Sequence, residues 1–240
     1  SNFTKEVMGK TVFEKIDEVT KQKTGDIRVN KPIEVLFEGV DTNIYKKTSE
    51  ISDELQSEMS KIKEKFAFLY TGHWLQGNLG EDRKDTGMLV KTFLETFKNY
   101  SNPPALVMKT SGATFSVIDR NDIQEKIESI KASVNGKLPN VQMNELYNHS
   151  KVKVHISFTH GEGYGRPLLE ATMSEKPVVA SNWSGHIDFL EKQYSTLLSG
   201  AMTKVPDKAF PPEMMVEGAQ WFSVNYQYAS KVMKKMYKTL

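Results

Sequence analysis

The chain has 240 residues, of which 38% are hydrophobic and 26% charged, a composition typical of a globular protein with a sizeable core. No apolar run reaches the roughly 18–20 residues of a membrane-spanning helix, and no signal-peptide pattern is present. Cysteine is absent, which excludes disulfides and thiolate metal sites and fits a cytoplasmic protein. With 32 basic and 30 acidic residues the net charge is only +2, which gives no support for nucleic acid as a partner.

The first forty residues predict one helix and one strand. Phe3, Val7 and Phe13 can share an apolar helix face, and Ser1 is a good helix cap. The short apolar run at 32–37 ends in a turn and predicts a strand.

From residue 66 onward the pattern alternates between strands and helices. The expected strands are 66–71, 105–109, 152–157 and 177–181, and the expected helices are 86–100, 121–134, 166–174 and 221–237. Short, nearly continuous apolar strands between helices indicate a parallel sheet that is covered on both faces. We therefore expect an α/β fold, a Rossmann-like parallel sheet with helices on both faces.

One connection in this alternation, between an expected strand and the helix that follows it near residue 140, is too short. The pattern predicts a strand that begins near residue 138, yet the residues from 142 already have a helical pattern, which leaves no room for a return loop. We expect a deletion or gap between Asn140 and Val141.

A glycine-rich loop follows the expected strand at 152–157 and precedes a helix that starts near Arg166. Its glycines are Gly161, Gly163 and Gly165. Glycines let the backbone approach a ligand, and free N–H groups at a helix start suit a phosphate. Glu162 in the loop and Glu170 in the helix can accept hydrogen bonds from vicinal hydroxyls. A glycine-rich turn with ordinary surface glutamates is the alternative, but the strand–loop–helix context favours a binding site.

These residues resemble a known family. The spacing Glu162-x7-Glu170, followed by Pro-Val-Val-Ala-Ser at 177–181 and Gly-His-Ile-Asp-Phe at 185–189, resembles group 1, family 4-type glycosyltransferases of the GT-B fold. Gly-Val-Asp at 39–41 resembles the turn that opens their C-terminal domain. The similarity extends over nearly the whole chain and is strongest at 157–190.

The resemblance implies a domain organisation. The chain looks like the C-terminal half of a GT-B glycosyltransferase. Residues 1–30 would be a remnant of the N-terminal domain boundary and linker, residues 31–212 a nucleotide-sugar-binding Rossmann-like domain, and residues 213–240 a C-terminal helical extension. In the family a terminal helix crosses back to the N-terminal domain, so the apolar stripe at 221–237 would be an exposed docking surface.

The resemblance also assigns roles. Glu162 would bind the transferred sugar, Glu170 the ribose, and the pair Arg83 and Lys84 would neutralise the diphosphate, so the catalytic set is Arg83, Lys84 and Glu162. The remaining donor-binding residues would be Gly72, His73, Lys109, Gly163, Tyr164, Gly165 and Glu170. Cations near a departing diphosphate stabilise the charge that it gains in the transition state.

Two residues depart from the family pattern. His73 follows Gly72 where the family has arginine, and Asp85 follows the basic pair where the family has glycine. A protonated histidine can bind phosphate, but it lacks the fixed donor fork of arginine. Lys109, at the end of a strand, could supply part of the missing charge.

The implied activity is transfer of a hexose from a UDP- or GDP-sugar to an acceptor, with retention of configuration and no metal or other cofactor. The partners would be the nucleotide sugar and an N-terminal acceptor-binding domain, without which we expect this chain to transfer poorly. Two alternatives stay open, a non-catalytic nucleotide-sugar binding module and a GT-B phosphorylase or epimerase.

Other candidate residues favour structural interpretations. His155 and His160 could join Glu162 around a metal, but zinc needs three or four convergent ligands and their spacing fits no known pattern. Trp183 and Trp221 fall in apolar surroundings and suit a core.

Trp74 and the basic stretch at 231–238 can each be interpreted in two ways. Trp74 lies in a polar loop and could either stack on a base or cover the loop. The basic stretch 231–238 is better explained by a solvated helix face than by a membrane contact, because its lysines alternate with core-like residues.

Overall fold

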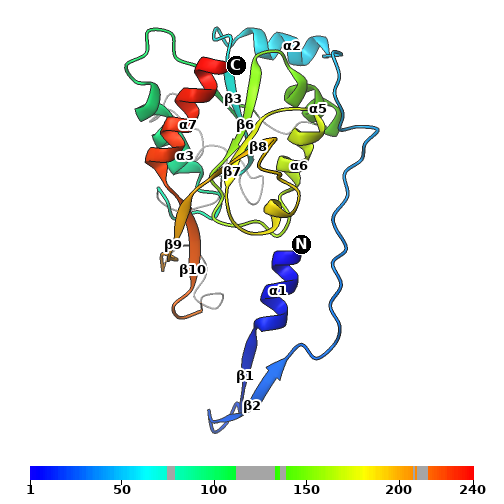
Figure 1. Cartoon of the computed structure of the whole chain (residues 1–240), viewed down its shortest axis with the longest axis vertical. Helices are drawn as coiled ribbons and strands as arrows, with labels where there is room; N and C mark the ends of the chain where they lie inside the picture. Colours follow the sequence, from blue (N-terminus) through cyan, green and yellow to red (C-terminus); the bar gives the residue numbers. More distant parts are fainter. Residues whose placement is uncertain (75–78, 112–132, 136–138, 208, 210–215) are drawn as a thin grey trace.

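The centre of the molecule is a six-stranded sheet, seen in a computed structural model that describes residues 1–74, 79–111, 133–135, 139–207, 209 and 216–240. The strands are β3 (Ala67–His73), β4 (Ala105–Ser111), β5 (Ser133–Asn135), β6 (Val152–Ser157), β7 (Val178–Ser181) and β8 (Ser195–Leu198). All neighbouring pairs are parallel, in the order β5-β4-β3-β6-β7-β8 (Figure 1). The order of the strands therefore reverses between β3 and β6.

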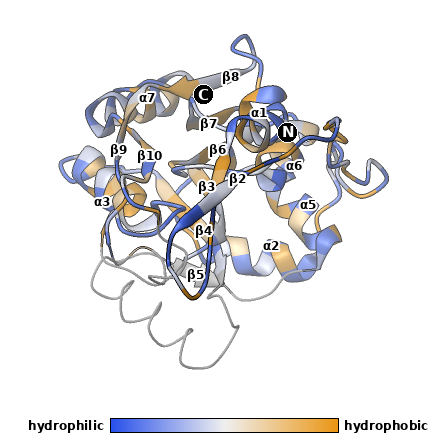
Figure 2. Cartoon of the chain, turned by 90° about the horizontal axis from the view of Figure 1, so that it is seen from below, coloured by the Kyte–Doolittle hydropathy of each residue, from blue (hydrophilic) through white to orange (hydrophobic). Residues whose placement is uncertain are grey.

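Helices cover both faces of this sheet. Figure 2 shows α3 (Thr86–Phe97) and α7 (Tyr226–Thr239) on one side, and α2 (Asp53–Ser60), α5 (Asn140–Asn148) and α6 (Arg166–Met173) on the other. The predicted fold class, a Rossmann-like parallel sheet with helices on both faces, is confirmed.

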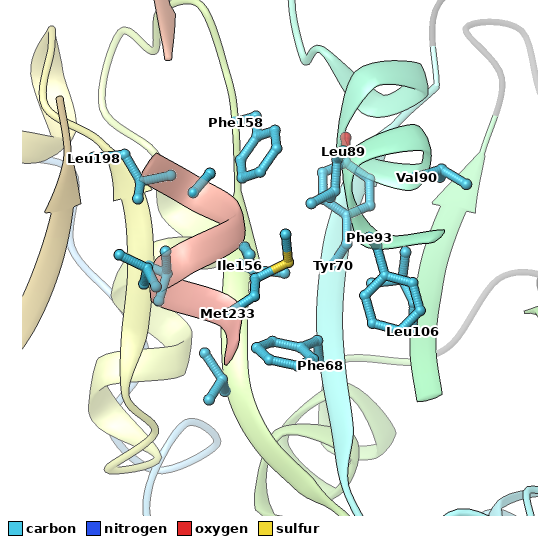
Figure 3. Packing of buried hydrophobic residues seen from close by; sticks show 14 of the residues in the cluster. Phe68, Tyr70, Leu89, Val90, Phe93, Leu106, Ile156, Phe158, Leu198 and Met233 are labelled. Carbon is cyan, nitrogen blue, oxygen red and sulfur yellow. The ribbon is translucent and has the colours of Figure 1, made fainter. Parts of the chain in front are cut away.

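Each face of the sheet has its own hydrophobic core. Under α3 and α7, Phe68 and Ile156 of the sheet pack with Phe93 and Met233 of the helices (Figure 3). The cluster on the opposite face includes Tyr45, Leu55, Met143, Leu168 and Ala180. Because both faces are covered, four successive residues at 67–70 are completely buried, which explains why this strand is apolar throughout rather than alternating.

The C-terminal region differs from its prediction. Trp221 and Phe222 lie in strand β10 (Gln220–Val224), which pairs with β9 (Gly200–Lys204), so the helix begins only at Tyr226. The apolar stripe of α7 is not an open docking surface, because Val232 and Met233 are buried against α3 and the sheet.

The N-terminal helix is shorter than predicted. Helix α1 (Asn2–Lys10) ends at Lys10, and a hairpin of β1 (Val12–Ile16) and β2 (Lys23–Arg28) follows it, extending away from the sheet domain (Figure 1). Phe13 is 62% exposed in this hairpin. Residues 32–37 form no strand, and Leu36 is 94% exposed there, because no other described strand lies alongside to pair with them.

At the expected deletion or gap the chain is continuous, which excludes a gap, and the deletion stays a prediction. Asn140 and Val141 are consecutive residues of α5, which runs without interruption to Asn148. Most of the predicted helix at 121–134 lies outside the described residues, because residues 112–132 are not described. Its last apolar residue, Val134, lies in strand β5.

The packing predicts a strong dependence of stability on Phe68. Replacing Phe68 by alanine should lower the free energy of unfolding by about 3–5 kcal/mol, because the ring is completely buried and the cavity cannot collapse fully. Urea denaturation of the chain measures the change. The matched control Leu36→Ala, at an exposed position, should change it by less than about 0.5 kcal/mol. Similar losses in both variants would contradict this assignment of the core.

Candidate functional site

The candidate site lies where the sheet order reverses. Open parallel sheets bind ligands in the crevice at the carboxyl ends of the strands that flank such a reversal. Here the loop after β3 brings Arg83 and Lys84, and the loop after β6 brings the glycine-rich segment 161–165. The backbone N–H of His160 donates to the carbonyl oxygen of Arg83 at 2.9 Å, which joins the two loops directly.

Glu162 is the centre of a compact charged cluster. Its carboxylate accepts a hydrogen bond from Nη1 of Arg83 at 3.2 Å and a shorter one from Nζ of Lys84. Arg83 Nη1 also donates to the carbonyl oxygen of Gly161 at 2.6 Å. The side chains of Lys84 and Glu162 are each only 10% exposed. The three residues that the resemblance assigns to catalysis are therefore brought together in the structure, although Glu162 lies 78 and 79 positions from Lys84 and Arg83 in the sequence.

Burial and charge act against each other on these groups. Burial raises the pKa of Glu162, but the charges of Lys84 and Arg83 and the hydrogen bond from Lys84 outweigh it, so the pKa is lowered and the carboxylate is ionised. Burial lowers the pKa of Lys84, and the charge of Glu162 only partly offsets this effect. Each charge is thus held in a nearly dry setting by the other.

The glycine-rich loop rests on a turn at 184–186, which begins the 3₁₀ helix η1 (Gly185–Asp188). The N–H of Glu162 donates to Oγ of Ser184 at 2.7 Å, and the N–H of Gly185 donates to the carbonyl oxygen of Glu162 at 2.9 Å. A Cβ on Gly185 would lie 2.1 Å from the carbonyl oxygen of Gly163, so no side chain fits there. Gly165 has φ +94°, in the left-handed region that favours glycine, where it caps α6.

Glu170 lies on the first turns of α6, mostly buried beside the loop. Its carboxylate accepts hydrogen bonds from the hydroxyl of Tyr147 at 3.1 Å and from Nε of Arg166 at 3.0 Å. Burial raises the pKa of Glu170, and these hydrogen bonds pull it in the opposite direction. Tyr164, which precedes the helix, packs its ring against Phe189 at a centroid distance of 5.1 Å.

Two aspartates shape the turn that carries the basic pair. Asp82 accepts hydrogen bonds from the N–H groups of Lys84 at 3.0 Å and Thr86 at 3.2 Å. Burial raises the pKa of Asp82 to about 6. Asp85 has φ +52°, a conformation that glycine adopts most easily, so the backbone here retains the geometry that a glycine would give.

The side chain of Asp85 links the turn to the C-terminal region. Its Oδ2 accepts a hydrogen bond from the hydroxyl of Tyr226 at 2.7 Å. Its Oδ1 faces Nε2 of His160 at 3.7 Å, while Nδ1 of that ring is 2.8 Å from the carbonyl oxygen of Phe222. Burial raises the pKa of Asp85 to about 7, so this carboxyl holds a proton over most of the acidic range.

The histidines and tryptophans have structural surroundings. His160 stacks on Trp221 with ring centroids 3.9 Å apart, and burial lowers the pKa of its ring. His155 is completely buried, and burial lowers its pKa to about 3. Trp74 packs in the core, which excludes stacking on a base, and Trp183 packs against the same core as predicted. Within the described part of the chain, no three His, Asp or Glu side chains gather as metal ligands would.

The remaining predicted residues surround β3 and β4. Gly72 and His73 end β3, and a Cβ on Gly72 would lie 2.6 Å from the hydroxyl of Tyr70. Lys109 pairs with Thr71 across the strands and lines a cavity of about 1200 Å³ beside β4, between α2 and α3. None of Arg83, Lys84 and Glu162 lines this cavity. We place the candidate site at the charged cluster instead, because its two cations and its carboxylate are the groups that can bind a charged ligand. The donor-binding roles of Gly72, His73 and Lys109 stay predictions.

Several residues that build the site have no role in the sequence analysis. They are Asp82, Tyr147, Ser184, Gly185 and Tyr226. The segment 185–189 was part of the quoted resemblance, and this motif was the signal that could have indicated the supporting turn. The other contacts join distant parts of the chain, and no local pattern reveals them.

Comparisons with known proteins show which family the chain is similar to. Residues 112–211 match the family model described as glycosyl transferases group 1. The chain is 25% identical over 141 residues to the capsular polysaccharide biosynthesis glycosyltransferase CapM of Staphylococcus aureus, an alignment that covers 57% of this chain and 35% of CapM. The chain resembles group 1 glycosyltransferases in sequence and in fold.

Two solved structures support the fold. The C-terminal domain of the group 1 glycosyltransferase LpcC from Francisella tularensis matches with a TM-score of 0.53 at 16% identity, over 83% of this chain and 88% of that domain. The pneumococcal O-GlcNAc transferase GtfA, solved with UDP and GlcNAc, matches with a TM-score of 0.50 at 16% identity, over 99% of this chain and 37% of GtfA. The chain thus spans about a third of the length of CapM and GtfA.

The contact between the glycine-rich loop and its supporting turn generates one prediction. Gly185→Ala should lower the free energy of unfolding by about 1–3 kcal/mol, because the new methyl group meets backbone atoms of residues 162 and 163 that must shift. Thermal or urea unfolding measures the loss. Gly163→Ala is the matched control, because nothing lies within 4 Å of its added Cβ, and it should stay within about 0.5 kcal/mol of wild type. Equal losses in both variants would refute the proposed contact.

Asp85 generates a prediction for pH dependence. Its folded-state pKa, about 7, lies above the ordinary value of 3.8, so its contribution to stability is fully present below about pH 4 and is lost as the pH rises through 7. The asparagine of Asp85→Asn cannot titrate, so the variant does not lose this stability as the pH rises. The melting temperature of the variant relative to wild type should therefore rise between pH 5 and pH 8.

The control for this pH experiment is Asp207→Asn, at a side chain that is 83% exposed. Its melting temperature relative to wild type should stay level over the same range. A level difference for Asp85→Asn as well would contradict the buried, protonated state of Asp85.

Proposed function

We propose that this chain is the donor-binding half of a glycosyltransferase and that it holds a nucleoside diphosphate sugar at the carboxyl ends of β3 and β6. One observation carries the proposal, the cluster of the partly exposed Arg83 with the largely buried Lys84 and Glu162 beside the glycine-rich loop. Two cations, a carboxylate and free backbone N–H groups at one sheet edge are the groups that recognise a diphosphate and a sugar.

In this proposal Arg83 and Lys84 bind the diphosphate. Both side chains are held within reach of the loop by Glu162, so they are positioned before the ligand arrives. The site is nearly dry, and a low dielectric strengthens the attraction of the two cations to the charge that develops on the leaving diphosphate. They stabilise the transition state most, because the diphosphate gains its full charge only as the glycosidic bond breaks.

The two glutamates then recognise hydroxyl groups. Glu162 is ionised and accepts hydrogen bonds from hydroxyls of the transferred hexose. Glu170, which Tyr147 and Arg166 orient, accepts hydrogen bonds from the ribose of the nucleotide. The backbone of Gly163, Tyr164 and Gly165, at the start of α6, faces the distal phosphate.

The reaction needs no protein nucleophile in this arrangement. We infer a retaining transfer, in which the leaving phosphate takes the proton of the acceptor hydroxyl as the new bond forms on the same face of the sugar. Arg83 and Lys84 supply the positive charge, so we infer that no metal ion takes part. UDP and GDP are both candidates for the nucleotide, and the presence of UDP in the structure of GtfA makes UDP the first to test.

An acceptor site requires more than this chain. The chain spans 35% of CapM, and we propose that the acceptor binds an N-terminal domain that faces the charged cluster across a cleft. This chain alone should then bind the nucleotide sugar but transfer the sugar poorly or not at all. We propose the cytoplasm as its compartment, in keeping with the absence of cysteine.

Calorimetric titration of the chain with UDP, GDP, ADP, UDP-glucose and GDP-mannose tests the donor site. Lys84→Ala should weaken binding of the preferred nucleotide by about 10- to 150-fold, the range expected when a hydrogen bond to a charged group is lost. Lys91→Ala, on the exposed surface of α3, is the matched control and should leave the affinity unchanged.

Glu162→Gln separates sugar recognition from phosphate recognition. We expect this variant to lose the preference for a nucleotide sugar over the free nucleotide while it still binds the free nucleotide. Failure of every nucleotide to bind, or equal affinities of wild type and Lys84→Ala, would overturn the proposed function.

A further inference from the structure

The net positive charge of the chain comes from one helix. Helix α7 contains four lysines and no acidic residue. The rest of the chain keeps all 30 acidic residues and has four fewer basic residues than the total of 32, so it is net negative. The small positive charge of the whole chain therefore does not describe how its charge is distributed.

The four lysines share one exposed side of α7. At 100° per residue, Lys231, Lys234, Lys235 and Lys238 fall within a sector of about 100°. The opposite side of the helix is buried through Val232 and Met233. The stems of the four lysines, with Thr239, surround a shallow, open hollow of about 350 Å³, so their ammonium groups gather around one patch of surface.

No carboxylate balances this patch within the part of the chain that the structure describes. Lysines on other helices have such partners, for example Lys10 with Glu6 and Lys91 with Glu95. Like charges three and four residues apart destabilise a helix, and the four lysines make several such pairs. An anionic partner would remove that repulsion.

The sequence alone favours a solvated helix face over a membrane contact for residues 231–238, but the structure gathers the four lysines around one patch with no described carboxylate partner. We propose that α7 binds reversibly to an anionic lipid surface through Lys231, Lys234, Lys235 and Lys238. Several properties of the patch fit lipid headgroups. All the cations of the patch are lysines, which act as hydrated point charges suited to mobile phosphates rather than to a fixed bidentate partner. Tyr228, 39% exposed one turn before Lys231, can lie at the level of the headgroups.

The apolar side of α7 is already used in the protein core, so the helix contacts the lipid surface without inserting into it. Polybasic segments bound in this way are attracted by charge alone, and each lysine raises the partition coefficient about fivefold. Such an attachment is weak and depends on salt, because screening shortens the reach of each charge to about 8 Å at physiological ionic strength.

The contact would also place the donor site near the lipid. Helix α7 begins at Tyr226, whose hydroxyl bonds Asp85 beside the basic pair, and its 14 residues span about 21 Å. A surface that meets the lysines would therefore lie within about one helix length of the charged cluster.

Co-sedimentation with lipid vesicles tests the proposal. The vesicles consist of phosphatidylcholine alone or of phosphatidylcholine with 30% phosphatidylglycerol, and binding is measured at low, physiological and high salt. The chain should bind only the anionic vesicles, and binding should disappear at high salt. The variant K231Q/K234Q/K235Q/K238Q should lose at least a hundredfold in partition coefficient, as four lysines at about fivefold each imply.

Two further variants separate the effect of the α7 lysines from general loss of charge and from loss of folding. The control K5Q/K15Q/K31Q/K63Q removes the same charge from exposed lysines outside α7 and should keep most of the binding. Replacing the four α7 lysines by arginine retains the charge and should also keep it, which separates loss of charge from loss of folding. Equal losses in the control, no binding to anionic vesicles, or stronger binding to duplex RNA than to vesicles would overturn the proposal.

Discussion

The reversal of strand order between β3 and β6 is the constraint on which the rest of the structure depends. The chain first builds β4 and β5 outward from β3 and then returns to lay β6 on the other side of β3. Because neighbouring strands are parallel, their following loops leave the sheet at the same edge, side by side. Residues 83 and 162, which are 79 positions apart in the sequence, can therefore form an ion pair.

The ion pairs of Glu162 hold the site ready in the absence of a ligand. A buried charge without a partner is strongly unfavourable, so Lys84 and Glu162 stabilise each other before the diphosphate of the proposed function binds. When an anion binds, Lys84 can be shared between it and Glu162 without becoming desolvated anew. This arrangement reduces the rearrangement that binding requires, which is the physical content of preorganisation.

The sequence was sufficient to predict the local features and insufficient for those that depend on distant contacts. Strands such as β6 and the loop–helix unit around Glu162 follow from local apolar runs and glycines. That Arg83, Lys84 and Glu162 belong to one site came only from the family resemblance, and their ion pairing was not predicted. The link from Asp85 to Tyr226 was missed because nothing in either local segment indicates the other. The hydrophobic periodicity wrongly placed Phe13 on a helix face, whereas the residue lies in an exposed hairpin. Periodicity alone does not show whether a partner surface exists to bury an apolar face.

The contact of Gly185 with the glycine-rich loop also limits how a site of this kind can diversify. Backbone touches backbone there, so neither evolution nor a designer can adjust the loop by substituting a larger residue at Gly185. In the proposed function, a change of donor preference would have to come from side chains beside this turn, such as Tyr164, which packs on Phe189, and Arg166, which bonds Glu170. An engineering library for a new donor is therefore best directed to those positions, with the turn at 184–186 left unchanged.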